Sequence, residues 1–145
     1  MDLNKPNLRH LLLTRAEWME QRLYANAERN GYGDITPSMS RLMALLAGRP
    51  QGLSDLARRL GITRQAVHKL ATEANALGYV EFFDSPSDAR IKLLRFTRKG
   101  REMAASAEQE LARIEAGLCR HIGTHRLQVL KEILAMPWSE EEANK

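Results

Sequence analysis

Apolar side chains repeat with helical spacing over most of the chain. In the first long segment, 6–30, they recur every three or four residues on one face, and a second apolar stripe runs beside it. A helix with two apolar stripes can pack against two surfaces. Thr36 and Pro37 then predict the N-cap and first residue of a short second helix, which extends to Leu46.

Two more short helices follow in the middle of the chain. The first, 55–60, is expected to begin after Ser54, and the second, 64–77, after Thr63, because serine and threonine are common N-caps. A glycine follows each helix and favours its termination. The two helices are therefore predicted to be joined by a short turn.

A hairpin and two longer helices complete the pattern. Runs of β-type residues at 79–83 and 91–96 flank a segment rich in turn residues. Thr97 is expected to cap a long helix, which Gly123 interrupts, and a last helix ends before Pro137. The predicted fold is mainly α with one small β-hairpin.

Length and composition indicate one globular domain, 1–145, of ordinary hydrophobic and charged content. The longest apolar run, 42–47, is too short to span a membrane. The first ten residues lack the apolar core of a signal peptide, and the single cysteine, Cys119, cannot form an internal disulfide. These features predict a cytoplasmic protein without a membrane partner.

Basic charge is concentrated in the middle of the chain. The whole chain has a net charge of +4, whereas residues 49–101 hold 11 Lys and Arg against 5 Asp and Glu, a net of +6. Such a segment favours a polyanionic partner. On charge alone, a solvated basic surface is the better interpretation, so the assignment depends on the shape that carries the charge.

The most specific pattern is the pair of short helices joined at Gly61. A helix-turn-helix needs a short turn and a second helix that is buried on one side and polar on the other. The side predicted to be buried carries Val67, Leu70, Ala71, Ala74 and Leu77. The opposite side carries Gln65, His68, Lys69 and Thr72, with Arg64 on its flank.

These polar side chains can read base edges or bind phosphates in the major groove of DNA. The helix N-terminus near Thr63 and Arg64 adds a phosphate site, because its backbone N–H groups and its dipole favour anions. The alternative is an ordinary helical hairpin with a solvated surface.

The loop of the predicted hairpin places Arg90 at its tip and Lys92 on the returning strand. An arginine at a protruding tip can enter a narrow minor groove, where negative potential is concentrated. Asp88 is close enough in sequence to hold the guanidinium by a charge-assisted hydrogen bond. The alternative is a local salt bridge with no role in DNA binding.

The run from Leu56 to Gly100 resembles the winged-helix core of MarR-type regulators. The matching pieces are Leu-Ala-Arg-Arg-Leu-Gly at 56–61, Gly-Tyr-Val at 78–80, Asp-Ser-Pro-Ser-Asp-Ala-Arg at 84–90 and Phe-Thr-Arg-Lys-Gly at 96–100. Two positions depart from the family's pattern. Phe82 stands beside Phe83 where the family often has a basic residue, and Ala89 replaces the first of two basic residues in the wing.

The resemblance implies a winged helix-turn-helix lobe at 36–100, flanked by helices at 1–31 and 101–145 through which a homodimer forms. It also implies that helix 64–77 enters the major groove and the wing arginine the minor groove. The groove or phosphate contacts that it implies are Thr63, Arg64, Gln65, His68 and Lys69, with Asp88 and Arg90 as the wing pair.

Family members commonly respond to a small aromatic or phenolic acid. The resemblance therefore suggests an effector pocket lined by Trp18, Met19, Met39 and Met43, with Arg15 or Arg22 holding a carboxylate. The alternative is that methionine and tryptophan at helical spacing form plain core.

Other chemistry is not indicated. The sequence has no phosphate loop, dinucleotide fingerprint or nucleophile elbow, so neither an enzyme nor a cofactor is expected. His121 and His125 have helical spacing, but Gly123 lies between them and no third His or further Cys stands nearby in sequence, which argues against a metal site. Cys119 is expected to be a buried, inert thiol rather than a redox sensor.

These observations predict a transcriptional regulator that binds double-stranded DNA sequence-specifically, at a pseudo-palindromic operator with half-sites about 10 base pairs apart. The resemblance favours repression, relieved by a small aromatic ligand. The alternative is a winged helix that docks an acidic protein and does not recognise a DNA sequence.

Overall fold

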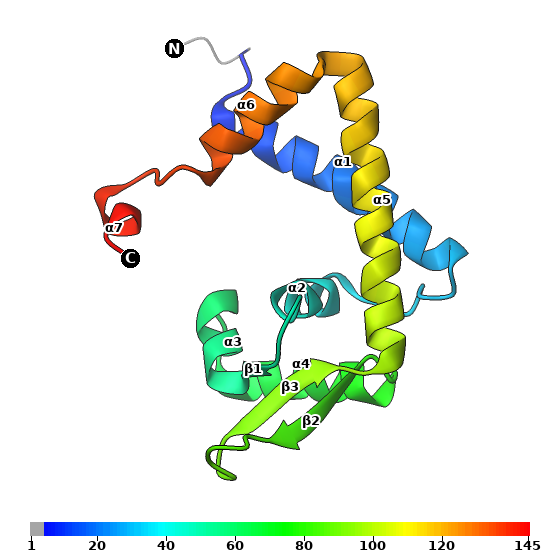
Figure 1. Ribbon diagram of the computed structural model, residues 1–145, viewed down its shortest axis with the longest axis vertical. Coiled ribbons are helices and arrows are strands. Elements are labelled where there is room, and N and C mark those ends of the chain that lie inside the picture. Colours follow the sequence, from blue (N-terminus) through cyan, green and yellow to red (C-terminus); the bar gives the residue numbers. More distant parts are fainter. Residues whose placement is uncertain (1–4) are drawn as a thin grey trace. The chain divides into compact units, whose positions relative to one another are not determined.

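The computed structural model describes residues 5–145, so the expectations for residues 1–4, at the start of the predicted segment 1–31, lie outside it. In chain order the elements are α1 (Leu8–Arg29), α2 (Pro37–Leu45), β1 (Gln51–Gly52), α3 (Leu53–Leu60), α4 (Arg64–Ala76), β2 (Val80–Asp84), β3 (Lys92–Phe96), α5 (Arg98–Ile122), α6 (Thr124–Ala135) and α7 (Glu140–Ala143) (Figure 1). The predicted class, mainly helical with a small β-hairpin, is confirmed. The chain forms two compact units: the first ends at Glu108, within α5, and the second is Gln109–Lys145.

Two of the predicted helix caps form as local chemistry dictates. The hydroxyl oxygen of Thr36 accepts a hydrogen bond from the backbone N–H of Met39 at 3.2 Å, and that of Thr63 accepts one from Ala66 at 3.1 Å. Between α3 and α4, Gly61 has φ +66°, a left-handed conformation that ends α3 without side-chain strain. The sharp turn of the predicted helix-turn-helix is therefore present.

The predicted N-cap of α3 is wrong. The helix begins at Leu53, directly after Gly52, and no side chain caps it. The preceding residues form the short strand β1, which pairs with β3 at Gln51↔Leu94 and Gly52↔Leu93. The helix starts there because β1 pairs with a distant strand and because Leu53, 2% exposed, is buried. Ser54 is exposed and lies one residue inside the helix. The residues around β1 do not indicate that it pairs with a strand as distant in sequence as β3.

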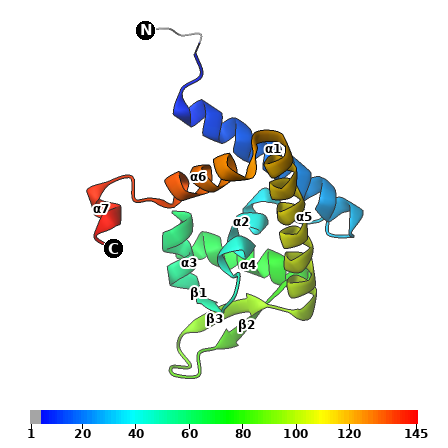
Figure 2. The same cartoon turned by 45° about the horizontal axis from the view of Figure 1, so that its top comes forward.

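The three strands form an antiparallel sheet in the order β1-β3-β2. In the hairpin, Val80 pairs with Phe96, Phe82 with Leu94, and Asp84 with Lys92. Because successive side chains of a strand point to opposite faces, these pairs share one face of the sheet. That face is the inner one, since Val80 and Leu94 are fully buried. The loop of the hairpin projects beyond the neighbouring helices (Figures 1 and 2).

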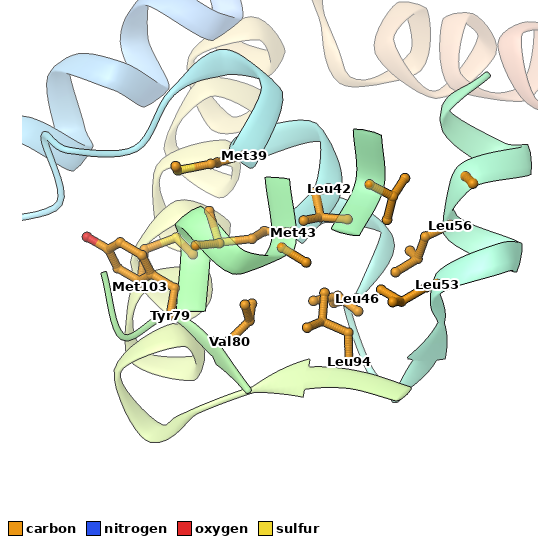
Figure 3. Packing of buried hydrophobic residues seen from close by; sticks show 14 residues of the cluster. Met39, Leu42, Met43, Leu46, Leu53, Leu56, Tyr79, Val80, Leu94 and Met103 are labelled. Carbon is orange, nitrogen blue, oxygen red and sulfur yellow. The ribbon is translucent and has the colours of Figure 1, made fainter. Parts of the chain in front are cut away.

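The hydrophobic core of the first unit lies between α2, α3, α4 and the inner face of the sheet. Side chains from all of these elements and from the start of α5 converge there (Figure 3). Buried residues of α4 in this core are Val67, Ala71 and Ala74, three of the five predicted, while Leu70 and Leu77 pack against it half-buried. The buried Tyr79 donates a hydrogen bond from its hydroxyl to Asp34, which ties the core to the segment before α2.

The junction of the wing with α5 explains the Thr-x-x-Gly sequence at 97–100. The hydroxyl of Thr97 donates to the carbonyl of Gly78 and accepts from the backbone N–H of Gly100 at 3.1 Å, as expected of a helix cap. A Cβ at Gly100 would lie 2.0 Å from the carbonyl oxygen of Tyr79 and 2.7 Å from the ring of Phe96. Only glycine allows this close approach between α5 and Tyr79, the residue before β2.

Helix α1 is joined to the start of α5 by a buried side chain. Asn26, 3% exposed, donates from its side-chain amide to the hydroxyl of Ser106 at 3.1 Å.

In the second unit, Lys131 of α6 bonds both carboxylate oxygens of Glu115 of α5 at 3.0 Å. Across residues 5–145, no helix combines the length and apolar character that a membrane span requires.

Candidate nucleic-acid interface

Helix α4 has one buried side and one polar side. The polar side consists of residues that are all exposed: Arg64, Gln65, His68, Lys69 and Thr72. Most of them also line a shallow hollow along the helix, together with Thr63 and Glu73. Among residues 5–145, no salt bridge involves Arg64 or Lys69. Two unpaired cations therefore lie on a helix surface that offers amide and hydroxyl groups as well.

The two threonines at this surface differ in what they can still bond. Because Thr63 uses its oxygen as an acceptor for the cap, its hydroxyl hydrogen remains able to donate to a phosphate. The hydroxyl of Thr72, in contrast, donates to the carbonyl of His68 at 2.8 Å. Thr72 can therefore accept a hydrogen bond from DNA, whereas donating one would require breaking the bond within the helix.

His68 is exposed, but one face of its imidazole is occupied. Its ring stacks on the ring of Phe82 from β2, with centroids 5.6 Å apart and planes 30° apart. Sequence reasoning identified Phe82 only as a departure from a family pattern and missed this contact. The alternation of β2 was the signal that could have found it, since Phe82 shares the inner face with Val80.

The wing loop holds Arg90 as predicted from its spacing to Asp88. Both Nε and Nη2 of Arg90 bond the Asp88 carboxylate, at 3.1 and 3.2 Å, and the Arg90 backbone N–H bonds it at 3.0 Å. These bonds, the side-chain ones first, lower the pKa of Asp88. The Arg90 side chain is 91% exposed, so the guanidinium is oriented by its partner while remaining accessible.

The other cations of the hairpin are also paired with acids. Lys92 bonds Asp84, and Arg95 bonds Glu81 at 2.8 Å, each across the ladder from its partner. Within 80–96, three cations thus face three acids. The predicted contact Lys92 is exposed but engaged in an ion pair. The net charge of +6 in 49–101 therefore comes from residues outside the hairpin.

A family model described as "MarR family" matches residues 34–91, the stretch that contains α2, α3, α4 and the wing loop. This stretch belongs to the MarR family.

Relatives and solved structures agree with this assignment. The "uncharacterized HTH-type transcriptional regulator YhbI" of Bacillus subtilis is 30% identical over 98 residues, which cover 63% of this chain and 64% of YhbI. The alignment thus spans slightly less than two thirds of that relative. The structure of the transcriptional repressor CouR bound to a 23-mer DNA duplex has a TM-score of 0.70 at 25% identity, covering 89% of this chain and 90% of CouR.

A further similarity is one of fold. The structure of NadR in complex with 4-hydroxyphenylacetate has a TM-score of 0.70 at 20% identity, and the match covers 93% of this chain and 94% of NadR. The likeness in fold therefore covers most of the chain and not only the matched MarR-family stretch.

The six residues predicted to line an effector pocket lie in two different environments. Met39 and Met43 are 4% exposed and belong to the core of the MarR-family stretch. On α1, Arg15 and Trp18 are exposed and Met19 is half-buried. The guanidinium of Arg22 lies 5.4 Å from the centre of the Trp18 ring.

A separate pocket of about 250 Å³ lies between the end of α1 and the start of α2. Its lining residues are Tyr24, Ala27, Glu28, Tyr32, Gly33, Ile35 and Pro37.

The remaining candidates lie in the second unit. Cys119 is a free cysteine and half-buried, so it is more accessible than the predicted buried thiol. Within the part of the chain that the structure describes, no three His, Cys, Asp or Glu side chains come together as a metal site would require.

Proposed function

We propose that this chain is a transcriptional regulator that binds double-stranded DNA sequence-specifically through α4. The observation that carries the proposal is the polar side of α4, where unpaired Arg64 and Lys69 flank the hydrogen-bonding groups of Gln65 and His68. Amide and imidazole groups can bond base edges, and the cations can neutralise phosphates. Thr63 and the N-terminus of α4 add donors to a phosphate.

The wing supplies a second contact in this proposal. Arg90, oriented by Asp88, enters the minor groove beside the half-site, where A·T-rich sequence narrows the groove. Lys92 contacts the DNA backbone from the returning strand. The structure of CouR on a DNA duplex, which shares this fold at 25% identity, supports a DNA-binding role for the arrangement.

We further propose that the chain acts as a homodimer on a pseudo-palindromic operator. Large apolar side chains are exposed on α1 (Leu8, Leu11 and Leu13) and on α6 (Leu130, Ile133 and Leu134). Six large apolar side chains exposed on these two helices favour burial against another copy of the chain. A two-fold dimer requires half-sites about one helical turn of DNA apart. In this proposal the protein acts in the cytoplasm, where its binding to the operator represses transcription by occluding a promoter.

The proposed effector is a small aromatic or phenolic acid. Support comes from NadR, which has this fold and was solved with 4-hydroxyphenylacetate, and from the exposed Arg15 and Trp18 on α1. Met39 and Met43 fill the core, so the proposal depends mainly on Arg15, Trp18, Met19 and Arg22. Thermal melts with a panel of aromatic acids test it: stabilisation that Arg15→Ala or Arg22→Ala reduces supports it, and no stabilisation by any acid contradicts it.

Selection of random duplex DNA by the purified protein, followed by sequencing of the bound fraction, tests the DNA-binding proposal. We expect enrichment of a two-fold-symmetric motif whose half-sites are about 10 base pairs apart. Enrichment of no motif, together with weak binding that does not depend on sequence, would contradict it. That result would favour the alternative, a winged helix that docks an acidic protein.

A further inference from the structure

The stack between His68 and Phe82 joins the proposed recognition helix to the wing. Phe82 lies on the inner face of the hairpin, opposite Leu94, and packs against the core of the first unit. The imidazole of His68 lies against it, with ring centroids 5.6 Å apart. The position of an exposed side chain on α4 is thus determined by a side chain that is anchored in the sheet.

This contact restricts how His68 can present its hydrogen-bonding atoms. The two nitrogens of an imidazole lie in the ring plane, so stacking on one face leaves both of them at the edge. An exposed histidine without such a partner samples several rotamers, and ordering it on a base lowers affinity through lost entropy. His68 also lines two hollows, one with Arg64 and Gln65 beside Leu53, and one with Lys69 and Thr72. The fixed ring therefore lies where a DNA base would contact α4.

We propose that Phe82 is a positioning residue for base readout: by stacking on His68 it fixes the imidazole edge that contacts DNA. The base preference of α4 then depends on a wing residue that itself touches no DNA. This inference rests on the proposed DNA-binding function. It goes beyond that function because the orientation of His68 on α4, and with it the base preference, depends on Phe82 of β2.

The adjacent Phe83 provides a matched control. It has the same side chain but lies on the opposite face of β2, where the guanidinium of Arg95 lies 4.2 Å from the centre of its ring. Replacing Phe83 removes an aromatic ring from the same strand without removing the contact to α4. A general effect of weakening the hairpin would appear in both variants, whereas an effect on His68 would appear only at Phe82.

The test is selection from random duplex DNA with the wild type and with Phe82→Leu, Phe82→Tyr, Phe83→Leu and His68→Ala. We expect Phe82→Leu and His68→Ala to relax the preference at the same base-pair position, by roughly threefold to tenfold. Phe82→Tyr keeps the stacked ring and should keep the wild-type motif, as should Phe83→Leu. NMR should show a ring-current shift of the His68 imidazole protons in the wild type that disappears in Phe82→Leu and persists in Phe83→Leu.

Several results would overturn the inference. One is that Phe82→Leu selects the wild-type motif, and another is that it relaxes the motif at positions that His68→Ala leaves unchanged. Equal relaxation by Phe83→Leu would show a general effect of the hairpin instead. Should Phe82→Leu fail to fold, Phe82→Met, which keeps a flexible apolar side chain without a ring, takes its place. If the wild type enriches no motif at all, the proposed function fails, and that outcome is distinct from the others.

Discussion

Helix α4 and the wing hairpin both carry cations, but the surroundings of these cations differ. On α4, Arg64 and Lys69 have no salt-bridge partner among residues 5–145, whereas each of the three cations of the hairpin is bonded to an acid. A cation without a partner can neutralise a phosphate directly and release counterions. A cation bonded to an acid brings no net charge, but its position is fixed. We infer that α4 provides the affinity and its salt dependence, and that the wing provides orientation.

The largest expected effect comes from removing both unpaired cations of α4. Arg64→Ala with Lys69→Ala should weaken binding to the selected operator by roughly 1.5–3 kcal/mol for each charge lost. The slope of log affinity against log salt concentration should become shallower by about 0.9 for each lost contact. Titration of labelled duplex at several salt concentrations measures both. Arg126→Ala, which removes an exposed cation of α6, is the control, and an equal loss there would contradict the assignment to α4.

Changing the amide of α4 should alter specificity more than affinity. Gln65→Ala should reduce discrimination at one base-pair position by about 1–3 kcal/mol, with little change in the salt slope. Competition between duplexes substituted at single positions measures this. A uniform loss across all sequences would indicate that Gln65 contacts the backbone and not a base.

Removing the wing arginine should have a smaller effect, confined to part of the site. Arg90→Ala should weaken binding about tenfold on duplexes with A·T-rich flanks and less on G·C-rich flanks, since the narrow minor groove attracts the guanidinium. Asp88→Asn should lower affinity less, because it leaves the guanidinium present but less well oriented. Unchanged affinity of Arg90→Ala at physiological salt would show that the wing assignment is wrong.

The pH dependence of the wing pair follows from the bonds between Arg90 and Asp88. Because the folded-state pKa of Asp88 is lowered, the pair stabilises the fold above the ordinary value of 3.8, and that contribution is lost as pH falls through the lowered value. We therefore expect no effect on DNA binding near neutral pH. NMR titration of the Asp88 carboxyl should give a higher pKa in Arg90→Ala, and an unchanged pKa would contradict the pairing in solution.

The smallest effect is expected at the outer face of the hairpin. Glu81→Gln combined with Arg95→Gln removes an exposed ion pair, which should change the free energy of unfolding by less than about 1 kcal/mol. DNA affinity should not change, since the pair carries no net charge. A clear loss of affinity would mean that the outer face of the wing contacts DNA.

The sequence predicted best what depends on neighbouring residues. Thr36, Thr63 and Thr97 cap their helices because a hydroxyl reaches the N–H three residues later, and that geometry depends on local spacing alone. The pairing of Asp88 with Arg90 is local in the same way. Ser54 failed as a cap because burial of Leu53 and pairing of β1 with a distant strand set the start of α3.

Features that depend on contacts between residues distant in sequence were harder to predict from the sequence. The stack of Phe82 on His68 needs both the strand alternation and the placement of β2 beside α4. The pairs of Lys92 and Arg95 need the register of the hairpin, which the loop length alone leaves undecided. Met39 and Met43 have the spacing of both core and pocket residues, and only tertiary packing assigns them to the core.

Sequence-specific DNA recognition is tested most directly by measuring how the wild-type protein binds its selected operator and a scrambled duplex of equal length across a series of salt concentrations. We predict that affinity for both duplexes falls as salt rises, and that the operator is bound at least about 10³-fold more tightly at physiological salt. Equal affinity for the two duplexes, or an affinity that does not depend on salt, would contradict sequence-specific DNA recognition by α4.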